Sequence, residues 1–135
     1  TSDSYRYSSY YQSVFKSEFT APGIQRFGDL PADPNQPPIG DSVKNMVLHV
    51  ELPIMGNFVL MATDAPKEMG FNVIAGNNMH IQLEPDTKEE AIRLFNELSA
   101  GGKVSMELQD MFWGALFGSF TDKYGINWMI NHLKK

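Results

Sequence analysis

The sequence predicts an α+β fold made of two β-α-β-β-β modules, the first of which lacks its opening strand. The chain has 135 residues, of which 42% are hydrophobic and 12% aromatic, enough for a compact domain with a buried core. Two segments repeat apolar residues with the period of a helix, and several others alternate with the period of a strand. We expect a single domain over residues 1–135, with module one at about 1–70 and module two at about 76–135.

One helix is predicted in each module. In module two, Thr87 and Glu90 have the spacing of a capping box, and two glycines follow the last turn. The helix over 87–99 carries one apolar stripe, made of Ala91, Leu94, Phe95 and Leu98. The helix over 4–16 depends on periodicity alone, because its many Ser and Tyr residues have low helix propensity. Its stripe consists of Tyr7, Tyr10, Tyr11, Val14 and Phe15.

Alternation with a period of two predicts the strands. In 46–53 the apolar residues share one face, and His49 and Glu51 share the other. The same alternation occurs in 79–84, 103–108 and 126–131, and less regular strands are expected at 24–27, 57–63 and 115–121. The proline-rich segment 28–45 is expected to be a long loop. Because aligning the two helices places the missing strand just before Thr1, we expect the printed chain to begin after it.

Charge and composition exclude several classes of protein. The net charge is −5, and no basic cluster exceeds the terminal pair Lys134–Lys135, which argues against a nucleic-acid partner. The absence of cysteine removes disulfides, thiolate zinc sites and cysteine nucleophiles. No apolar run approaches the roughly 20 residues that span a bilayer, and 1–13 is too polar for a signal peptide. We therefore expect a cytoplasmic protein that binds neither nucleic acid nor membranes.

Five strings resemble the PhnB-like branch of the vicinal oxygen chelate superfamily, which includes glyoxalases, bleomycin-resistance proteins and dioxygenases. They are YQSVFKSEF (11–19), QRFGDLPADP (25–34), LHVEL (48–52), LMATDA (60–65) and LQDMFWGALFGSFTDKYGINWMIN (108–131). The resemblance implies a glyoxalase-like open barrel whose concave side holds a ligand, and a homodimer. Some relatives carry a demethylubiquinone methyltransferase label. The sequence does not support that activity, because it has no Gly-rich strand-to-helix turn for a methyl-donor nucleotide.

The resemblance also bears on a metal site. Metalloenzymes of this superfamily hold a divalent ion with His and Glu side chains from the first, fourth, fifth and eighth strands. The fifth-strand position falls on His80 and the eighth on Met129. The fourth falls on Leu60 or Met61, and the first lies before Thr1. Because Leu and Met do not suit a hard divalent ion, we expect the usual metal site to be absent and no cofactor to be bound.

The polar faces of the predicted strands supply the candidate site. We expect the ligand cleft to include His49, Glu51, Met61, His80, Gln82, Trp113, Met129 and Asn131. His49 and Glu51 are the candidates for a general base and the group that orients it. Together with His80 they form the alternative of a rearranged metal site. The same polar face is also typical of any half-buried sheet, and Trp128 is expected to be a core residue.

Two functions remain open. The first is a metal-independent, PhnB-like protein that binds an unknown small molecule. The alternative is an enzyme of lyase, isomerase or dioxygenase type, with a rearranged metal site or a His/Glu base. Arg6, Arg26 and Arg93 are the only arginines, so the sequence shows no concentrated site for a phosphonate group.

Overall fold

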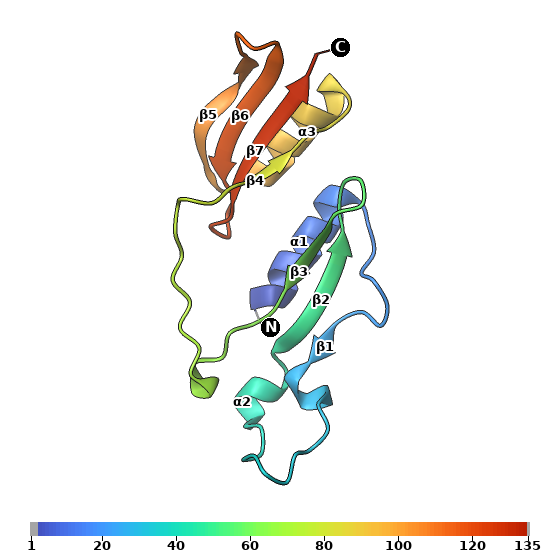
Figure 1. The fold of residues 1–135 in the computed structure, drawn as a ribbon, viewed down its shortest axis with the longest axis vertical. Helices are drawn as coiled ribbons and strands as arrows, with labels where there is room; N and C mark the ends of the chain where they lie inside the picture. The colour runs from blue at the N-terminus through green and yellow to red at the C-terminus, as the bar shows by residue number, and fades with distance from the viewer. Residues whose placement is uncertain (1–2, 135) are drawn as a thin grey trace. The chain divides into compact units, whose positions relative to one another are not determined.

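The computed structural model describes residues 3–134 and divides the chain into two compact units, Thr1–Ile74 and Ala75–Lys135 (Figure 1). The first unit holds α1 (Asp3–Phe15), β1 (Gln25–Arg26), η1 (Phe27–Asp29), α2 (Asp41–Lys44), β2 (Val47–Pro53), β3 (Val59–Ala62) and η2 (Lys67–Met69). The second holds β4 (Ile81–Leu83), α3 (Lys88–Ser99), β5 (Lys103–Asp110), β6 (Ala115–Thr121) and β7 (Asn127–Leu133). Among the described residues no helix is both long and apolar enough to cross a membrane.

Each unit contains one sheet, and the predicted α+β class is confirmed. The first sheet has the antiparallel order β1-β2-β3. The second has the order β4-β7-β6-β5, in which β4 runs parallel to β7 and the other pairs are antiparallel. Over residues 3–134 these two sheets form no closed barrel, which agrees with an open glyoxalase-like fold. That the two modules make a single domain stays a prediction.

In the first unit, α1 packs against β2. The helix buries Tyr11 and Val14, and the strand buries Val50 and Leu52 against it. The predicted helix is confirmed to within one residue at each end, and it stops where Lys16 takes a left-handed backbone conformation with φ 53°.

The segment 28–45 was predicted to be loop only, and this was wrong in part. It contains most of η1 and all of α2. The Arg26 backbone N–H donates to the Asp29 carboxylate at 2.7 Å, and the Arg26 guanidinium donates to the Asn45 carbonyl. Such short helices have no apolar period in the sequence, because side-chain to backbone bonds rather than a buried stripe hold them.

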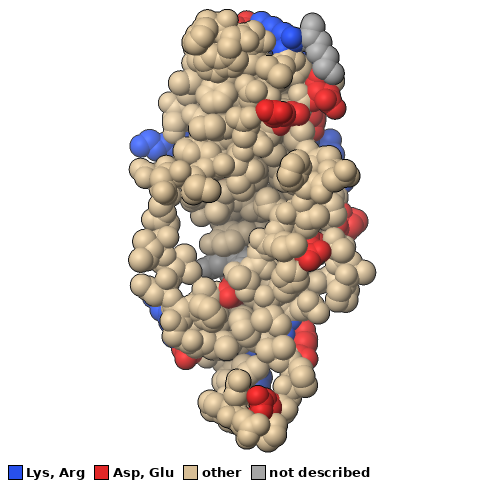
Figure 2. All heavy atoms as spheres, viewed as in Figure 1, with Lys and Arg blue, Asp and Glu red and all other residues tan. Residues whose placement is uncertain are grey.

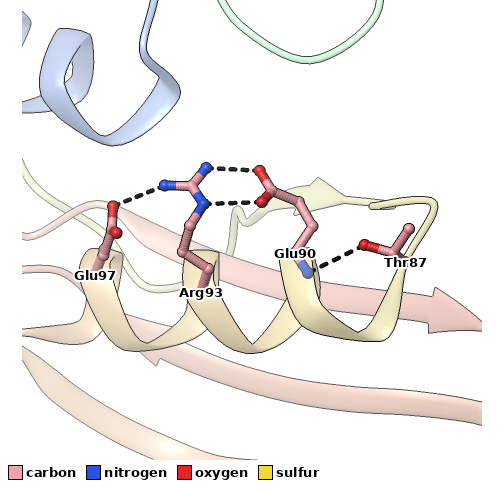
Figure 3. Close-up of polar contacts among 4 residues, drawn as sticks. All are labelled: Thr87, Glu90, Arg93 and Glu97. Carbon is pink, nitrogen blue, oxygen red and sulfur yellow. Dashed lines mark hydrogen bonds and ion pairs between the residues drawn. The ribbon is translucent and has the colours of Figure 1, made fainter.

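In the second unit, α3 begins at the predicted cap and packs against β5, β6 and β7. The Thr87 hydroxyl accepts a hydrogen bond from the Glu90 backbone N–H at 3.2 Å, as shown in Figure 3. The helix buries the predicted stripe, which consists of Ala91, Leu94, Phe95 and Leu98.

Close packing between α3 and β6 depends on Gly118. The Phe95 ring lies where a side chain at Gly118 would be, since a Cβ there would meet the ring at 2.7 Å. The same Cβ would meet the Leu108 backbone at 3.1 Å. Phe95 also makes an edge-to-face contact with Phe120 at 5.1 Å between ring centroids. Glycine in the middle of this strand therefore lets the helix approach the sheet.

The turn between β6 and β7 is organised by Asp122, whose side chain is buried at 3% exposure. One carboxylate oxygen accepts from the backbone N–H groups of Tyr124 (2.9 Å) and Ile126 (3.0 Å). The other accepts from the indole N–H of Trp128 at 2.8 Å. Trp128 is fully buried, as the sequence predicted. One carboxylate thus fixes both the turn and the orientation of the largest core side chain.

Three strand predictions needed correction. Residue 79 was placed in a strand, but β4 begins at Ile81 and Met79 is 77% exposed. Ile126 was assigned to the buried face, but its carbonyl closes the turn onto the Asp122 N–H at 2.8 Å and its side chain is 40% exposed. Met106 was also assigned to the buried face. An irregularity in the β5–β6 register places it opposite Ser119 on the other face.

We predict that Gly118→Ala destabilises the protein by about 1–3 kcal/mol, because the new methyl group overpacks the contact between α3 and β6. Gly40→Ala is the matched control, since its Cβ would meet only the Ser42 hydroxyl, at 3.9 Å. It should cost less than about 1 kcal/mol, as at an exposed helix cap. Urea unfolding measures both. Equal stability of Gly118→Ala and wild type would contradict the described packing.

We predict that Asp122→Asn costs about 1–3 kcal/mol of stability. The substitution replaces one of the two acceptor oxygens by an N–H₂ group, and when that group faces the Trp128 N–H, a buried donor is left unpaired. In a Trp128→Phe background the same substitution should cost less, because no indole donor remains. A double-mutant cycle followed by urea unfolding measures the coupling. Strictly additive effects of the two substitutions would show that this hydrogen bond does not link the turn to the core.

Candidate functional site

In the first unit, three of the predicted site residues share one face of the sheet. His49 and Glu51 are two residues apart on β2, and Met61 lies directly opposite Glu51 on β3. Directly paired residues of antiparallel strands project from the same face. This face is the one opposite the buried side chains Val50 and Leu52. The structure therefore brings His49, Glu51 and Met61 together.

His49 and Glu51 form a hydrogen-bonded pair. The His49 Nε2 lies 2.9 Å from the Glu51 Oε1, and the two side chains are 40% and 31% exposed. An ionised carboxylate can only accept, so Nε2 is the donor and a neutral imidazole keeps its lone pair on Nδ1. The described residues give Nδ1 no hydrogen-bond partner. The pair can therefore accept a proton or a hydrogen bond from a bound molecule at Nδ1.

In the second unit, the open face of the sheet carries the other predicted residues. Gln82 pairs with Met129 between β4 and β7, and Met129 pairs with Ser119 on β6. Asn131 lies opposite Phe117 in the next pair of the same face. The alternate residues of β7, Trp128 and Ile130, point to the other side, where both are fully buried.

Trp113 joins this face through a ring contact. It lies in the turn between β5 and β6, and its ring centroid is 5.8 Å from that of Phe117, in an edge-on arrangement. Phe112 contacts Trp113 in the same manner at 4.9 Å and is 95% exposed. Sequence reasoning singled out Trp113 but missed Phe117, whose alternation with the buried Leu116 and Gly118 is a weak signal.

His80 precedes β4 and is exposed. Two residues further on, the Gln82 amide donates a hydrogen bond to the Glu84 carboxylate at 2.7 Å. His132 is half-buried in β7. Its Nδ1 lies 2.8 Å from the Pro85 carbonyl oxygen, which ties the segment after β4 to the last strand.

At two of the positions that the resemblance assigns to metal ligands, the side chains do not suit a divalent ion, whereas the third is His80. Leu60 and Met61 lie on β3 and Met129 on β7, and none of them offers an oxygen or nitrogen ligand. Within either unit, the described residues contain no group of three or more His, Asp or Glu side chains that could hold a metal ion.

The guanidinium groups of Arg26 and Arg93 form hydrogen bonds with other groups of the protein. In Figure 3 the Arg93 guanidinium points at two carboxylates, with Nε and Nη2 donating to Glu90 at 2.8 and 2.6 Å and Nη1 to Glu97 at 2.8 Å. The hydrogen bond to Glu90 is the main reason why the pKa of Arg93 lies above its usual value, although partial burial opposes it. Within the surface of each unit that Figure 2 shows, Lys and Arg side chains form no broad patch.

Asp122 is the functional-looking residue that sequence reasoning missed. It is a buried carboxylate within the family-like string 108–131, and such a residue suggests a catalytic role. Its three hydrogen bonds to Tyr124, Ile126 and Trp128 instead make it a structural residue. The signal was present as Asp122 followed by Gly125, a combination typical of a turn closed by an aspartate side chain.

Comparison with known proteins agrees with this architecture. Residues 28–130 match the Glyoxalase/Bleomycin resistance protein/Dioxygenase superfamily. The structure of protein PA1353 from Pseudomonas aeruginosa is 33% identical, with a TM-score of 0.81, and the alignment covers 100% of this chain and 92% of that one. A PhnB protein from Bacillus cereus is 24% identical with a TM-score of 0.71, over 97% and 92% of the two chains, and shares the fold.

A curated relative, Protein YjdN from Escherichia coli strain K12, is 33% identical over 93 residues. The match takes in 66% of this chain and 58% of YjdN, so it spans little more than half of that protein's length. The two β-sheets with their covering helices define a glyoxalase-like fold. The chain belongs to the glyoxalase/bleomycin resistance protein/dioxygenase superfamily, as the five strings indicated, and its structural neighbours include a PhnB protein.

We predict that neutral His49 carries its proton on Nε2, because Glu51 accepts from that nitrogen. Nitrogen-15 NMR of the imidazole ring distinguishes the two tautomers. In Glu51→Gln the preference should weaken, since the amide can turn either group toward the ring. Glu84→Gln, a substitution of an exposed carboxylate in the other unit, serves as the control and should leave the His49 tautomer unchanged. An Nδ1–H tautomer in wild type would contradict the pairing.

Proposed function

We propose that this chain is a metal-independent protein that binds a small molecule on the open faces of its sheets. The observation that carries the proposal is Met129. It lies on the open face of the second sheet, between Gln82 and Ser119, where the resemblance places a metal-binding carboxylate. A thioether there offers apolar, polarisable surface to an organic molecule and no ligand to a hard cation.

The neighbouring side chains support this proposal. Met61 lies on the open face of the first sheet and is 63% exposed. The resemblance assigns the fourth-strand ligand position to Leu60 or Met61. Sites for small molecules are commonly lined by apolar and aromatic groups with a few polar groups that fix orientation. Met129 with Ser119 and Asn131, and Met61 with His49 and Glu51, each follow that composition.

The second candidate is an enzyme in which His49 acts as a general base. The 2.9 Å contact between His49 and Glu51 favours it, because a carboxylate that holds Nε2–H orients Nδ1 toward a substrate proton. This chemistry requires no metal ion, so it is compatible with Met61 and Met129. The same contact also suits a binding protein, in which Nδ1 accepts a hydrogen bond from the ligand.

The resemblance further implies a homodimer, and we include this assembly and a cytoplasmic location in the proposal. Within each unit, the Lys and Arg side chains that Figure 2 shows do not gather into a broad patch. This supports a ligand other than nucleic acid.

We predict that the purified protein retains less than a stoichiometric amount of divalent metal. Addition of Zn²⁺, Ni²⁺ or Mn²⁺ should leave its melting temperature unchanged, because an ion that does not bind the native state cannot stabilise it. Elemental analysis and thermal unfolding with and without each ion measure this.

His80→Ala is the informative variant, because His80 is the one residue of ligand type at the positions that the resemblance assigns. Tight, stoichiometric binding in wild type that disappears in His80→Ala would refute metal independence. Binding that disappears instead in His49→Ala would identify the rearranged site and would equally refute the proposal.

A further inference from the structure

The open face of the second sheet presents two rows of side chains that run across the strands. In the first row Phe117 of β6 lies between Gln109 of β5 and Asn131 of β7. In the second row Ser119 lies between Met106 and Met129, and the row continues to Gln82 of β4. We call these two rows, together with Trp113, whose ring contacts that of Phe117 edge-on, the platform.

Three polar side chains of the platform have no hydrogen-bond partner among residues 3–134. They are Gln109, Ser119 and Asn131, and all three are exposed or half-buried. Polar side chains beside them are paired. The Thr121 hydroxyl donates to Asn127 at 2.8 Å, and the Asn127 amide donates to the Met79 carbonyl at 3.2 Å. The two unpaired carboxamides therefore flank the Phe117 ring, and each offers both a donor and an acceptor.

The platform contains no charged side chain. Asp110, which follows Gln109 on β5, forms an ion pair with Lys134 at 2.8 Å, and the hydrogen bond from Lys134 is the main cause that lowers the pKa of Asp110. Beside Gln82, the Glu84 carboxylate already accepts from the Gln82 amide at 2.7 Å. An anionic ligand would lose hydration on this surface and gain no opposite charge in return. The surface accordingly suits a neutral molecule.

The aromatic side chains determine the shape of that molecule. Trp113 is 46% exposed and meets Phe117 edge-on, so part of the indole remains open beside a phenyl ring. Phe112, in contact with Trp113 and 95% exposed, extends the aromatic surface beyond the strands. Exposed aromatic groups gathered in this way commonly mark a binding surface.

We propose that the platform binds a flat, uncharged heteroaromatic molecule. Its ring stacks on the open part of the Trp113 indole and meets the Phe117 ring edge-on. Its edge donors and acceptors bond to the carboxamides of Gln109 and Asn131, and Met106 and Met129 provide apolar contact. This proposal rests on the proposed function and specifies its ligand class. A second copy of the chain or a peptide covering the same aromatic groups is an outcome that the experiment below distinguishes.

The test uses the full chain labelled with nitrogen-15, in which Trp113 and Trp128 give two indole N–H signals. The probes are riboflavin and caffeine, which are flat and uncharged, phenylphosphonate, which is aromatic and anionic, and cyclohexanecarboxamide, which is neither flat nor aromatic. We expect riboflavin or caffeine to shift the Trp113 signal saturably and to leave that of the buried Trp128 in place. Phenylphosphonate and cyclohexanecarboxamide should bind at least about tenfold more weakly, given the usual strength of stacking on an aromatic side chain.

Two variants identify the contacts. Trp113→Ala and Asn131→Leu should each weaken binding of the flat probe by about tenfold or more, as followed by the signals of Gln109 and Ser119. Phe58→Ala is the matched control, because Phe58 is a 76% exposed aromatic residue in the first unit and should be dispensable.

Several results would overturn the platform. They are no shift of Trp113 with any probe, equal binding of phenylphosphonate, an equal loss in Phe58→Ala, and a Trp113 signal that moves with protein concentration alone, as a second copy would cause. If the probes instead shift only His49 and Met61, the platform is wrong and small-molecule binding stands. A retained metal ion together with a normal Trp113 response would refute metal independence and leave the platform intact.

Discussion

The buried carboxylate of Asp122 is the constraint on which the second unit depends. By accepting from two backbone N–H groups of the turn and from the Trp128 indole, it sets where β7 begins relative to β6. A shift of one residue would move every side chain of β7 to the opposite face. With Trp128 and Ile130 fixed toward α3, Met129 and Asn131 must lie on the open face. The same interaction that completes the core therefore determines which residues the open face presents.

Most of the fold could be predicted from the sequence, because periodic burial leaves a periodic pattern. The stripe of α3 and the burial of Trp128 and Ile130 on β7 both appear in the structure as expected. What could not be predicted depends on interactions without a period. The irregularity that places Met106 on the open face is a local change of register. The triple role of Asp122 requires knowing that the Trp128 indole turns back toward the turn.

The candidate site was predictable to a similar degree. The two-residue spacing of His49 and Glu51 on an alternating strand predicted a shared face, and the structure adds the 2.9 Å contact. The family resemblance directed attention to Met129 and Met61, and the cross-strand registers place both on open faces. Phe117 could not be selected, because only the register reveals that it lies between Gln109 and Asn131. The superfamily scaffold is thus retained, and Met129 lies where the resemblance places a metal-binding carboxylate.

The central claim is that the open faces around Met61 and Met129 receive an organic molecule without a metal ion. Paramagnetic Mn²⁺ added to protein with carbon-13 labelled methionine methyl groups tests it most directly, because broadening reports the distance from a bound ion to each methyl group. The account predicts that stoichiometric Mn²⁺ leaves the Met61 and Met129 signals as sharp as that of Met46, which immediately precedes β2. Selective broadening of Met61 or Met129 at that concentration would contradict it.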